Sequence, residues 1–516
     1  MQAVPLSSWL MLAACIGVGL LNEVSGSVLT LAIPDAARDV GASKDAAQFI
    51  LLAGKLSLGA LMLAGGGLGD RFGRKRIMLN GIALIAVAAL LSAAARSAGM
   101  LGSARLLDGV GNALVGPLAF ALAIASFPDT MRGRVIGLFL GISGLGVAIG
   151  PLIAGTLVQM GGWRLGFAAP LALALVSGLA IMVLTKPELS EPRRPPWDPV
   201  GMLSCILGLI ALVLGFVLAG RDGWTAPATL GWLAGGVVGL ALFGWWETSR
   251  AAVPLLDPDL LRSREVLVAL AAAGLAAIIL NGTILPLLYF LQRIHGYGPV
   301  GSVLRLLPLI LAAMTVAPAA GGLAERHGRR LVMLAGLAAV AAGSGILSML
   351  TPNTPYGVIA AAMALVGAGV MAVITPAADL VMATSGAERS GSAAALNGTV
   401  MQVGGAIGIG VLTSVFTAEA VQGFAARMTA KGYAPQDIIE PARRLRDVIR
   451  ETTIRRVPEL PDIPPQLRQD ILDAYSQAFA AGVARAFLVA GVLSLAAIVI
   501  VLIGMRRRAG PATANS

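Results

Sequence analysis

Residues Gly66–Arg76 read GGLGDRFGRKR, a short polar stretch between two long apolar runs. One apolar run begins near Phe49 and ends in glycines, and the other begins at Ile77. Basic residues collect in the short cytoplasmic connections of membrane proteins. The stretch is too short for a domain, so it predicts a tight cytoplasmic turn between two membrane-spanning helices.

A second turn of similar chemistry lies at Ala324–Arg330, which reads AERHGRR. Its acid, Glu325, follows Asp70 by 325 − 70 = 255 positions. Internal repeats at the scale of several helices are common in transporters, where each repeat is one helical bundle. The two turns therefore predict two copies of one bundle.

The composition indicates that lipid surrounds most of the chain. Of its 516 residues, 57% are hydrophobic and 13% are charged, whereas a soluble domain is about 25% charged. The net charge of +11 comes from bases that gather between apolar runs, so we interpret it as a topology signal and expect no nucleic-acid partner. Cys15 and Cys205 lie within apolar runs, which predicts packing residues rather than a disulfide.

A membrane-spanning helix needs about 20 mostly apolar residues. The runs of this kind predict an all-α polytopic membrane protein with fourteen transmembrane helices. They cover 9–33, 46–69, 77–95, 101–126, 134–158, 165–184, 199–219, 228–247, 265–291, 299–323, 331–350, 356–382, 391–416 and 479–505.

Alternate connections are rich in basic residues, which predicts that they are cytoplasmic. These residues are Arg71, Arg74, Lys75 and Arg76; Arg132 and Arg134; Lys186, Arg193 and Arg194; Arg250, Arg262 and Arg264; Arg326, Arg329 and Arg330; and Arg506, Arg507 and Arg508. Because the number of helices is even, both termini are expected in the cytoplasm, with the protein in the cytoplasmic (inner) membrane. The polar connection 417–478 is then extracytoplasmic. Apolar spacing predicts helices over 438–455 and 466–479, either as a packed cap or as a docking site.

The first turn resembles the cytoplasmic loop signature of the major facilitator superfamily. The matching residues are Gly66, Leu68, Gly69, Asp70, Arg71, Gly73, Arg74 and Lys75. The second turn is a weaker match, because Glu325 replaces the aspartate. The resemblance implies two six-helix bundles with a major facilitator fold. It also implies that the loop carrying Asp70, Arg71 and Arg74 holds the inner side closed through pairs to neighbouring helix ends.

Fourteen helices are two more than two six-helix bundles need. The helices within 199–247 are therefore predicted as an insert between the bundles. The expected division is 1–190 for the first bundle, 191–260 for the inserted pair, and 261–516 for the second bundle, including the extracytoplasmic loop 417–478. Such a chain resembles the 14-helix drug:proton antiporter branch of the superfamily, the multidrug and quaternary-ammonium efflux type.

Two helices resemble further motifs of the superfamily. Arg105–Pro117 reads RLLDGVGNALVGP and resembles a fourth-helix motif whose buried arginine is tied to proton transfer. Asp108 stands where family members commonly carry glutamine, and its i, i+3 spacing lets it face Arg105. The pair is either structural or functional, and intramembrane charges usually mark transport pathways.

Gly137–Pro151 reads GLFLGISGLGVAIGP and resembles the fifth-helix motif associated with antiporters. Its glycines, with Gly146 and Gly150 near the end and Gly155 just beyond, allow a neighbouring helix to approach closely. Pro151 removes a backbone donor and bends the helix. This resemblance favours export over uptake.

Glu23 and Lys55 are two further charges inside apolar runs. At about 1.5 Å of rise per residue, both fall at a depth similar to that of Arg105 and Asp108. We therefore predict a four-charge cluster, formally neutral, with Glu23 as the proton carrier. The family places its first-helix acid nearer the position of Ser25, which is two residues from Glu23.

Other polar residues within the runs are candidates to line a cavity, although each could instead bond a neighbouring helix. They are Asn112, Asn281, Arg305, Asn397 and Gln402. The sequence has no G-x-x-x-x-G-K-[ST], no H-E-x-x-H, no paired-cysteine metal spacing and no nucleophile elbow. We therefore expect no ATP-driven pump, no enzyme, no metal site and no cofactor, with the proton gradient as the energy source.

The predicted function is secondary active transport. The chain is expected to export hydrophobic or cationic drugs and toxic compounds in exchange for protons, by alternating access and as a monomer. The alternative is a dedicated exporter of an endogenous lipid, siderophore or antibiotic, which the unusual Lys55 and the long outer segment fit better. A scaffold is disfavoured by the intramembrane charges.

Overall fold

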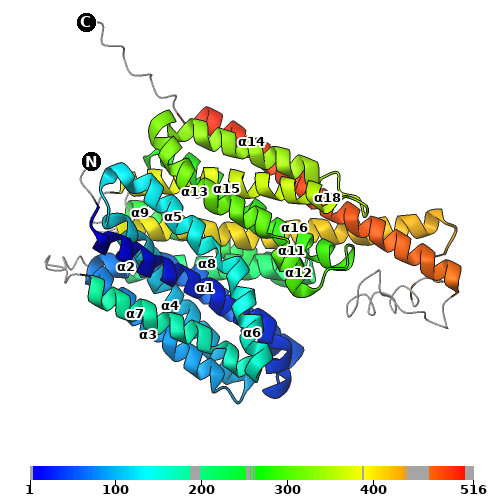
Figure 1. The fold of residues 1–516 in the computed structure, drawn as a ribbon, viewed down its shortest axis with the longest axis horizontal. Helices are drawn as coiled ribbons and strands as arrows, with labels where there is room; N and C mark the ends of the chain where they lie inside the picture. The colour runs from blue at the N-terminus through cyan, green and yellow to red at the C-terminus, as the bar shows by residue number, and fades with distance from the viewer. Residues whose placement is uncertain are drawn as a thin grey trace, which may run out of the picture.

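The computed structural model describes residues 4–185, 198–250, 256, 260, 262–385, 389–434, 436, 439 and 464–505. These residues form helices and short connections, and no strand occurs among them. Only residue 439 of the predicted helix over 438–455 is described, and the predicted domain boundary at 190/191 lies outside the described residues. Helices run roughly side by side along the longest axis of the molecule (Figure 1).

The described part of the first bundle contains seven α-helices. They are α1 (Leu6–Asp39), α2 (Lys44–Phe72), α3 (Arg74–Ala93), α4 (Ala98–Ala125), α5 (Arg132–Gly144), α6 (Gly146–Gly166) and α7 (Ala168–Leu184), with the short 3₁₀ helix η1 (Asp129–Met131) before α5. Next come α8 (Pro199–Asp222) and α9 (Pro227–Ser249). The second bundle contains α11 (Arg264–Arg293), α12 (Pro299–Leu304), α13 (Leu307–His327), α14 (Arg329–Leu347), α15 (Tyr356–Thr384), α16 (Ser390–Ala430) and α18 (Pro465–Gly504).

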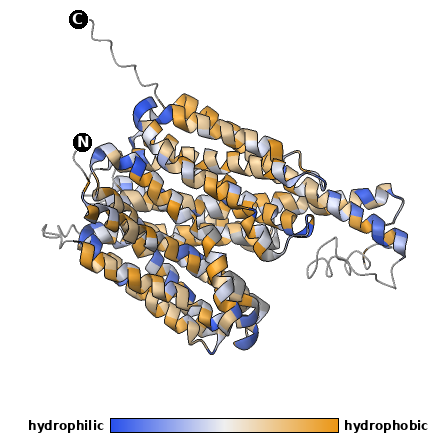
Figure 2. Cartoon of the chain, in the orientation of Figure 1, coloured by the Kyte–Doolittle hydropathy of each residue, from blue (hydrophilic) through white to orange (hydrophobic). Residues whose placement is uncertain are grey.

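The helices have the length and composition of membrane spans. Thirteen segments of the described residues are long and apolar enough to cross a membrane, and Ala168–Leu184 is a shorter apolar helix. Figure 2 shows hydrophobic residues along the helices and hydrophilic residues gathered at their ends. The prediction of an all-α polytopic membrane protein is confirmed. Cys15 and Cys205 are buried free thiols.

Each signature turn reduces to a single glycine with a left-handed backbone. Gly73 separates α2 from α3 with φ = 96°, and Gly328 separates α13 from α14 with φ = 90°. L-residues with a side chain rarely adopt this conformation. Most of the stretch predicted as a turn therefore belongs to the two helices on either side.

Two predicted helices are broken. The run 134–158 divides at Leu145 into α5 and α6, and the run 299–323 divides at Arg305 and Leu306 into α12 and α13. Pro308 explains the second break, because it has no N–H to donate to the carbonyl of Leu304. Glycines on both sides of Leu145 weaken the helix at the first break.

The last two helices extend beyond their predicted ends. Residues 417–430 continue α16 and residues 465–478 begin α18, so these parts of the predicted loop are helical. They project from the bundle in Figure 1 and pack around Met428, Ile471 and Ala474. The sequence analysis expected each helix to end after the length that spans a membrane. The small apolar core stabilises α16 and α18 beyond that length. The helix predicted over 466–479 is confirmed as part of α18.

The two bundles meet along two lines of contact. α2 packs against α16, which we call the α2–α16 seam, and α5 packs against α13, which we call the α5–α13 seam. The inserted helices α8 and α9 pack closely on each other, and α8 also packs on both α2 and α16.

Candidate functional site

A buried ion pair lies inside the first bundle. Arg105 and Asp108 are one turn apart on α4, with 3.2 Å between Arg105 Nη1 and Asp108 Oδ2. The Ser25 hydroxyl on α1 donates to Asp108 Oδ1 at 3.0 Å and accepts from Arg105 Nη1 at 3.0 Å. All three residues are buried. The hydrogen bonds of Ser25 connect α1 to α4. Removing either Arg105 or Asp108 would leave an uncompensated buried charge.

Glu23 faces a different neighbour from Ser25. Its carboxylate accepts a hydrogen bond from the Asn22 amide at 3.1 Å, and its Cβ lies 2.6 Å from where a Cβ on Gly146 of α6 would stand. Two residues turn a helix by about 200°. Ser25 therefore faces α4, while Glu23 faces α6.

Lys55 on α2 is exposed and is the charged neighbour that acts electrostatically on Glu23. No ion pair joins Glu23 to Lys55 among the described residues. The predicted four-charge cluster is therefore not one network. Arg105 and Asp108 form a buried ion pair on α4, and Glu23 and Lys55 lie outside it.

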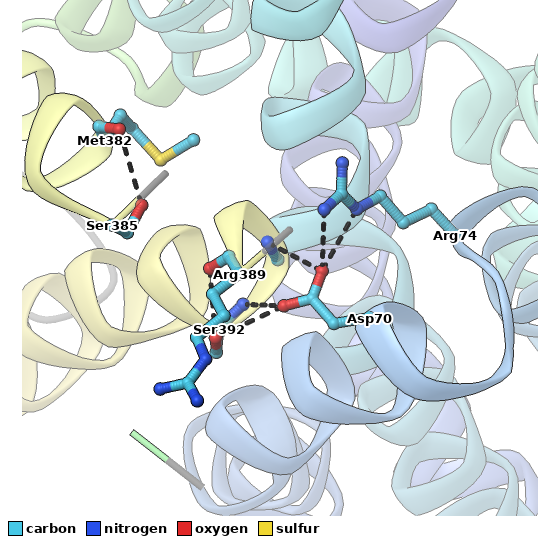
Figure 3. A network of polar contacts seen from close by, with 7 residues as sticks. Asp70, Arg74, Met382, Ser385, Arg389 and Ser392 are labelled. Atoms are coloured by element: carbon cyan, nitrogen blue, oxygen red, sulfur yellow. Dashed lines mark hydrogen bonds and ion pairs between the residues drawn. The ribbon is translucent and has the colours of Figure 1, made fainter. Parts of the chain in front are cut away.

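At the end of the bundles where α2 meets α3, Asp70 connects the first bundle to the second. Its carboxylate accepts hydrogen bonds from Gly391 N at 3.0 Å, Ser392 N at 2.8 Å and Ser392 Oγ at 3.2 Å, and from Arg74 Nε at 3.0 Å (Figure 3). The first N–H groups of a helix have no intrahelical partner and carry a partial positive charge. Asp70 on α2 therefore caps the start of α16.

The other residues of the first signature turn have distinct roles. Gly66 lies against the second bundle, because an added Cβ would stand 2.3 Å from the Gly391 oxygen. Lys75 donates to the carbonyls of Met182 at 2.9 Å and Thr185 at 2.6 Å, which connects α3 to the end of α7. The Arg71 guanidinium lies 5.0 Å from the centre of the Phe72 ring.

The second turn makes the corresponding contact in the reverse direction. Glu325 Oε1 on α13 accepts a hydrogen bond from Gly133 N at the start of α5, at 3.2 Å. Nearby, Arg329 Nε lies 2.7 Å from the buried carboxylate of Asp379, which connects α14 to α15. Each acid of the repeat therefore contacts the first turn of a helix in the opposite bundle.

The glycines around the α5–α6 break face two different neighbours. Gly137 lies against the backbone of Ala317 on α13, where an added Cβ would stand 2.2 Å from the carbonyl oxygen. Gly146 and Gly150 lie against α1, with Ser27 Oγ 2.5 Å from an added Cβ on Gly150. Pro151 and Gly155 follow on α6. The predicted close packing therefore serves both the α5–α13 seam and the contact with α1.

The Gly162-Trp163-Arg164 turn connects α6 to the end of α1 and to the residues just after α3. Asp39 accepts hydrogen bonds from Arg164 and from the Trp163 indole at 3.1 Å, and Arg164 also donates to the Ala95 carbonyl at 2.9 Å. The Arg164 hydrogen bond, followed by that of Trp163, holds the pKa of Asp39 below its ordinary value.

The predicted cavity residues have mostly local partners. Asn112 and Asn281 each donate to a carbonyl one turn earlier, those of Asp108 and Ala277. Gln402 is partly buried on α16. Asn397 is buried, and its side-chain oxygen finds no hydrogen-bond partner among the described residues.

Arg305 lies at the α12–α13 break, away from the ion pair of the first bundle. Its guanidinium carbon is 3.5 Å from the centre of the Tyr297 ring and 5.5 Å from that of Tyr356. The Tyr356 hydroxyl donates to the Arg305 carbonyl at 3.1 Å. Cation–π contacts of this kind hold a side chain in place, so Arg305 stabilises the break.

An apolar cavity lies between the bundles, next to α5, and the space within it is about 580 Å³ with open solvent included. It is lined by Leu140, Gly141, Gly144, Leu280, Ile284, Leu306, Leu309, Ile310, Ala313, Gly367, Val370 and Met371. None of the candidate polar residues is among the lining residues.

Sequence reasoning missed two functional partners, Ser25 and Ser392. Ser25 was noted only as the usual position of a family acid, and Ser392 carried no signal in its own segment. Their partners are distant in sequence, with 83 positions between Ser25 and Asp108 and 322 between Asp70 and Ser392. The repeated turns place an acid, Asp70 or Glu325, at corresponding positions. A partner at a helix start in the other bundle, such as Ser392, could be sought only from this repeat.

Comparison with known families identifies the class of protein. The Major Facilitator Superfamily pattern matches residues 15–409. The chain belongs to the Major Facilitator Superfamily and is a multi-pass membrane protein of a transporter family. The fold is similar to that of the human organic anion transporter MFSD10 (TETRAN), with a TM-score of 0.59 and 13% identity, over 96% of this chain and 98% of that one.

Several bacterial relatives are similar over most of their length. The puromycin resistance protein pur8 of Streptomyces alboniger is 34% identical, over 79% of this chain and 82% of the relative. The tetracenomycin C resistance and export protein of Streptomyces glaucescens is 30% identical, over 97% of this chain and 92% of the relative. The multidrug efflux pump LfrA of Mycolicibacterium smegmatis is 30% identical, over 98% of this chain and 97% of the relative.

Proposed function

We propose that this protein exports hydrophobic or cationic drugs and toxic compounds across the cytoplasmic membrane in exchange for protons. The proton gradient is the energy source, and the protein acts as a monomer with both termini in the cytoplasm. The names of the relatives support this proposal, because they describe multidrug efflux and resistance to or export of single antibiotics.

The observation that carries the proposal is the buried ion pair Arg105–Asp108 with its hydrogen bonds to Ser25. Ionisable groups inside the bilayer are costly and usually belong to substrate or proton pathways. In major facilitator proteins the two bundles rock around a site near the membrane midplane. A change of charge at a contact between α1 and α4 would therefore alter the packing of the first bundle during this motion.

Glu23 is the proposed proton carrier. When it is deprotonated, its negative charge offsets the positive charge of Lys55 or of a cationic substrate. When it is protonated, that electrostatic attraction is lost. Its contact with Gly146 connects this change to α6, directly after the α5–α6 break. Because the break lies between Glu23 and the apolar cavity, a shift of α6 would reach the cavity wall at Gly144.

The test is Glu23→Gln in energised inverted vesicles. We expect proton-driven export to fall on the order of tenfold, which corresponds to about 1.4 kcal/mol of transition-state free energy. Glu419→Gln in the projecting part of α16 is the matched control, because it removes an acid far from this pair. Undiminished export by Glu23→Gln would exclude Glu23 as the carrier.

A second candidate function is export of one endogenous lipid, siderophore or antibiotic. The exposed Lys55 favours it, because a fixed positive charge opposes a cationic drug unless Glu23 neutralises it. Overexpression against a panel of dyes and biocides separates the two functions. Raised tolerance to many compounds supports multidrug export, and unchanged tolerance supports the dedicated exporter.

A further inference from the structure

The α2–α16 seam is closed at one end and parted toward the other. Near the turn from α2 to α3, an added Cβ on Gly66 would stand 2.3 Å from the Gly391 oxygen. One turn farther along α2, the Met62 side chain lies 2.3 Å from an added Cβ on Gly398. A Cβ added at Gly59 would meet no atom within 4 Å. The two helices therefore part beyond Met62, toward the end of the bundles opposite the α2–α3 turn, which we call the far end.

The α5–α13 seam parts in the same direction. Glu325 holds Gly133 at the start of α5, where the seam is closed. Farther along α5, an added Cβ on Gly141 would stand 3.0 Å from the Met314 oxygen, and one added at Gly144 would meet no atom within 4 Å. Both seams are thus closed near the signature turns and parted toward the far end. In alternating access, the far end must also close.

Lys55 continues the face of α2 that meets α16. It precedes Gly66 by eleven residues, and eleven residues are three helical turns plus about 20°. Lys55 is exposed, and it acts electrostatically on Glu23 of α1. A cation that lies near an acid of α1 and is aligned with the α16 contacts faces the gap between the bundles.

An exposed amide lies at the same level in the second bundle. α2 and α16 run antiparallel from the contact of Met62 with Gly398. Seven residues back along α2 is Lys55, and seven residues forward along α16 is Gly405, so these two positions lie at one level. The Asn281 side chain of α11 stands beside Gly405, with its Cγ 3.2 Å from an added Cβ there. Asn281 is exposed although it lies in the middle of a membrane span.

The amide of Asn281 and the ammonium of Lys55 both have unused hydrogen-bonding capacity. Within the described part of the chain, the Asn281 amide makes one hydrogen bond, from Nδ2 to the Ala277 carbonyl, and the Lys55 ammonium makes none. An amide oxygen accepts and an ammonium only donates. A charge taken out of water without a partner is costly. Closure of the far end therefore requires an acceptor for Lys55, and the Asn281 oxygen is at the level of Lys55.

We propose that Lys55 is a positioning residue that holds the far end closed by donating to the Asn281 oxygen, and that the charge of Glu23 decides when it does so. A deprotonated Glu23 attracts Lys55 toward α1, within the first bundle. A proton or a cationic substrate at Glu23 cancels this attraction and releases Lys55 to cross the gap. The inference rests on the proposed function. It explains how exchange avoids leakage, because the empty, deprotonated protein stays open.

The other polar groups around Glu23 leave Lys55 as the responding base. On α1 itself, the Asn22 amide donates to Glu23. The groups that the other helices packed on α1 place against it are Arg105 and Asp108 of α4, which bond each other and Ser25, Ser143 of α5, Gly146 of α6 and Ser177 of α7. The two charges among them are already paired, and the remaining groups are uncharged.

The test measures the width of the far end with two nitroxides. Cys15 and Cys205 are replaced by alanine, and the labels are attached after Leu52→Cys on α2 and Ile409→Cys on α16, which lie at nearly one level beyond Lys55. Double electron–electron resonance, in nanodiscs of phosphatidylethanolamine and phosphatidylglycerol, gives the ratio of short to long distances. Glu23→Gln imitates the protonated acid and should raise this ratio about tenfold at neutral pH.

Two further substitutions test the bond itself in the Glu23→Gln protein. Lys55→Met and Asn281→Leu should each lower the ratio about tenfold, because each removes one end of the same bond. Combined, they should lower it by less than about twofold beyond either one alone. Asn281→Asp should raise the ratio, because a carboxylate binds an ammonium more strongly than an amide does, and Lys55→Met should cancel that rise.

Gln422→Leu is the matched control, because it removes an exposed amide from the projecting part of α16 and should leave the ratio unchanged. An unchanged ratio after Lys55→Met would overturn the inference. So would losses from Lys55→Met and Asn281→Leu that multiply, or a rise from Asn281→Asp that persists without Lys55.

Export is measured separately, with tetraphenylphosphonium as the probe in proteoliposomes that carry a pH gradient. If the unaltered protein exports no probe, the proposed function fails, and the resonance data still decide whether Lys55 and Asn281 close the far end. If export occurs but the distance ratio responds to neither residue, the export function stands and the bond between Lys55 and Asn281 is wrong.

Discussion

The two signature turns have nearly the same backbone but make unequal contacts across the bundles. Gly73 and Gly328 share a left-handed conformation, and each follows an acid by three residues. Asp70 accepts three hydrogen bonds from the start of α16, and its side chain is 13% exposed. Glu325 accepts a hydrogen bond from Gly133 N of α5, and its side chain is exposed.

This difference teaches that the repeat preserves the geometry of the turn but not the strength of the contact. Hydrogen bonds to a charged group contribute about 1.5–3 kcal/mol each when shielded, and exposed ones contribute less because water competes. The α2–α16 seam is held by Asp70 and covered by α8. The α5–α13 seam depends more on small residues packed against each other, such as Gly137 and Ala317.

The largest effect is expected from Asp70→Asn, which removes the charge that accepts from Gly391 and Ser392. The amide nitrogen of asparagine would also face N–H donors. We expect proton-driven export to fall tenfold or more, because the loss of even one such bond corresponds to about 1.5–3 kcal/mol. Ser392→Ala is the control, since it removes one hydroxyl and keeps both backbone donors. If Asp70→Asn were as mild as that control, the contact would not hold the inner side closed.

A smaller effect is expected from Glu325→Gln. The neutral amide oxygen can still accept from Gly133 N, so about 0.5–1 kcal/mol should be lost. We predict that export falls less than about fivefold, measured in the same vesicles as Asp70→Asn. A loss as large as that of Asp70→Asn would break the distinction between the two seams and show that both acids hold the inner side equally.

The smallest effect is expected from Asp39→Asn, because the Asp39 contact joins α1 to α6 within the first bundle. Arg164 and Trp163 lower the pKa of Asp39. A lowered folded-state pKa contributes stability above the unfolded value, about 3.9, that is lost as the pH falls through the folded value. Asp39→Asn should leave export unchanged and lower the Tm in detergent by less than about 2 °C at pH 7.

The same measurement at low pH checks the sign of this effect. Once the pH falls below the lowered folded-state pKa of Asp39, the wild-type carboxyl is protonated, so the Tm difference between wild type and Asp39→Asn should disappear. A difference that grows as the pH falls would contradict the Arg164 contact. A change in export comparable to that of Asp70→Asn would show that contacts within one bundle matter as much as those across the seams.

Most of the fold could be predicted from the sequence, because a chain in lipid must satisfy its backbone within helices. The positions of the turns followed from the bases and glycines around Asp70 and Glu325. The breaks at Leu145 and Arg305 were not predicted, since hydropathy continues across them. Helical extension of α16 and α18 beyond the spans was also not predicted in full, because it depends on contacts such as Met428 with Ile471.

The candidate site was predictable only where its partners are close in sequence. Arg105 and Asp108 face each other because three residues are nearly one helical turn. Glu23 and Ser25 point to different sides of α1 because two residues turn a helix by about 200°. Only the packing of α1 between α4 and α6 shows which of the two residues meets the ion pair. The separation of the Arg105–Asp108 pair from Glu23 and Lys55 therefore required the structure.

By itself, the sequence determined that the chain crosses a membrane as helices and repeats one bundle, because hydropathy, charge and glycine act locally and can be read along the chain. Only the tertiary structure decided which carboxylate holds which seam, which seam α8 covers and where the apolar cavity lies. Those features depend on helices hundreds of residues apart coming into contact. Neither segment alone carries the information about its distant partner.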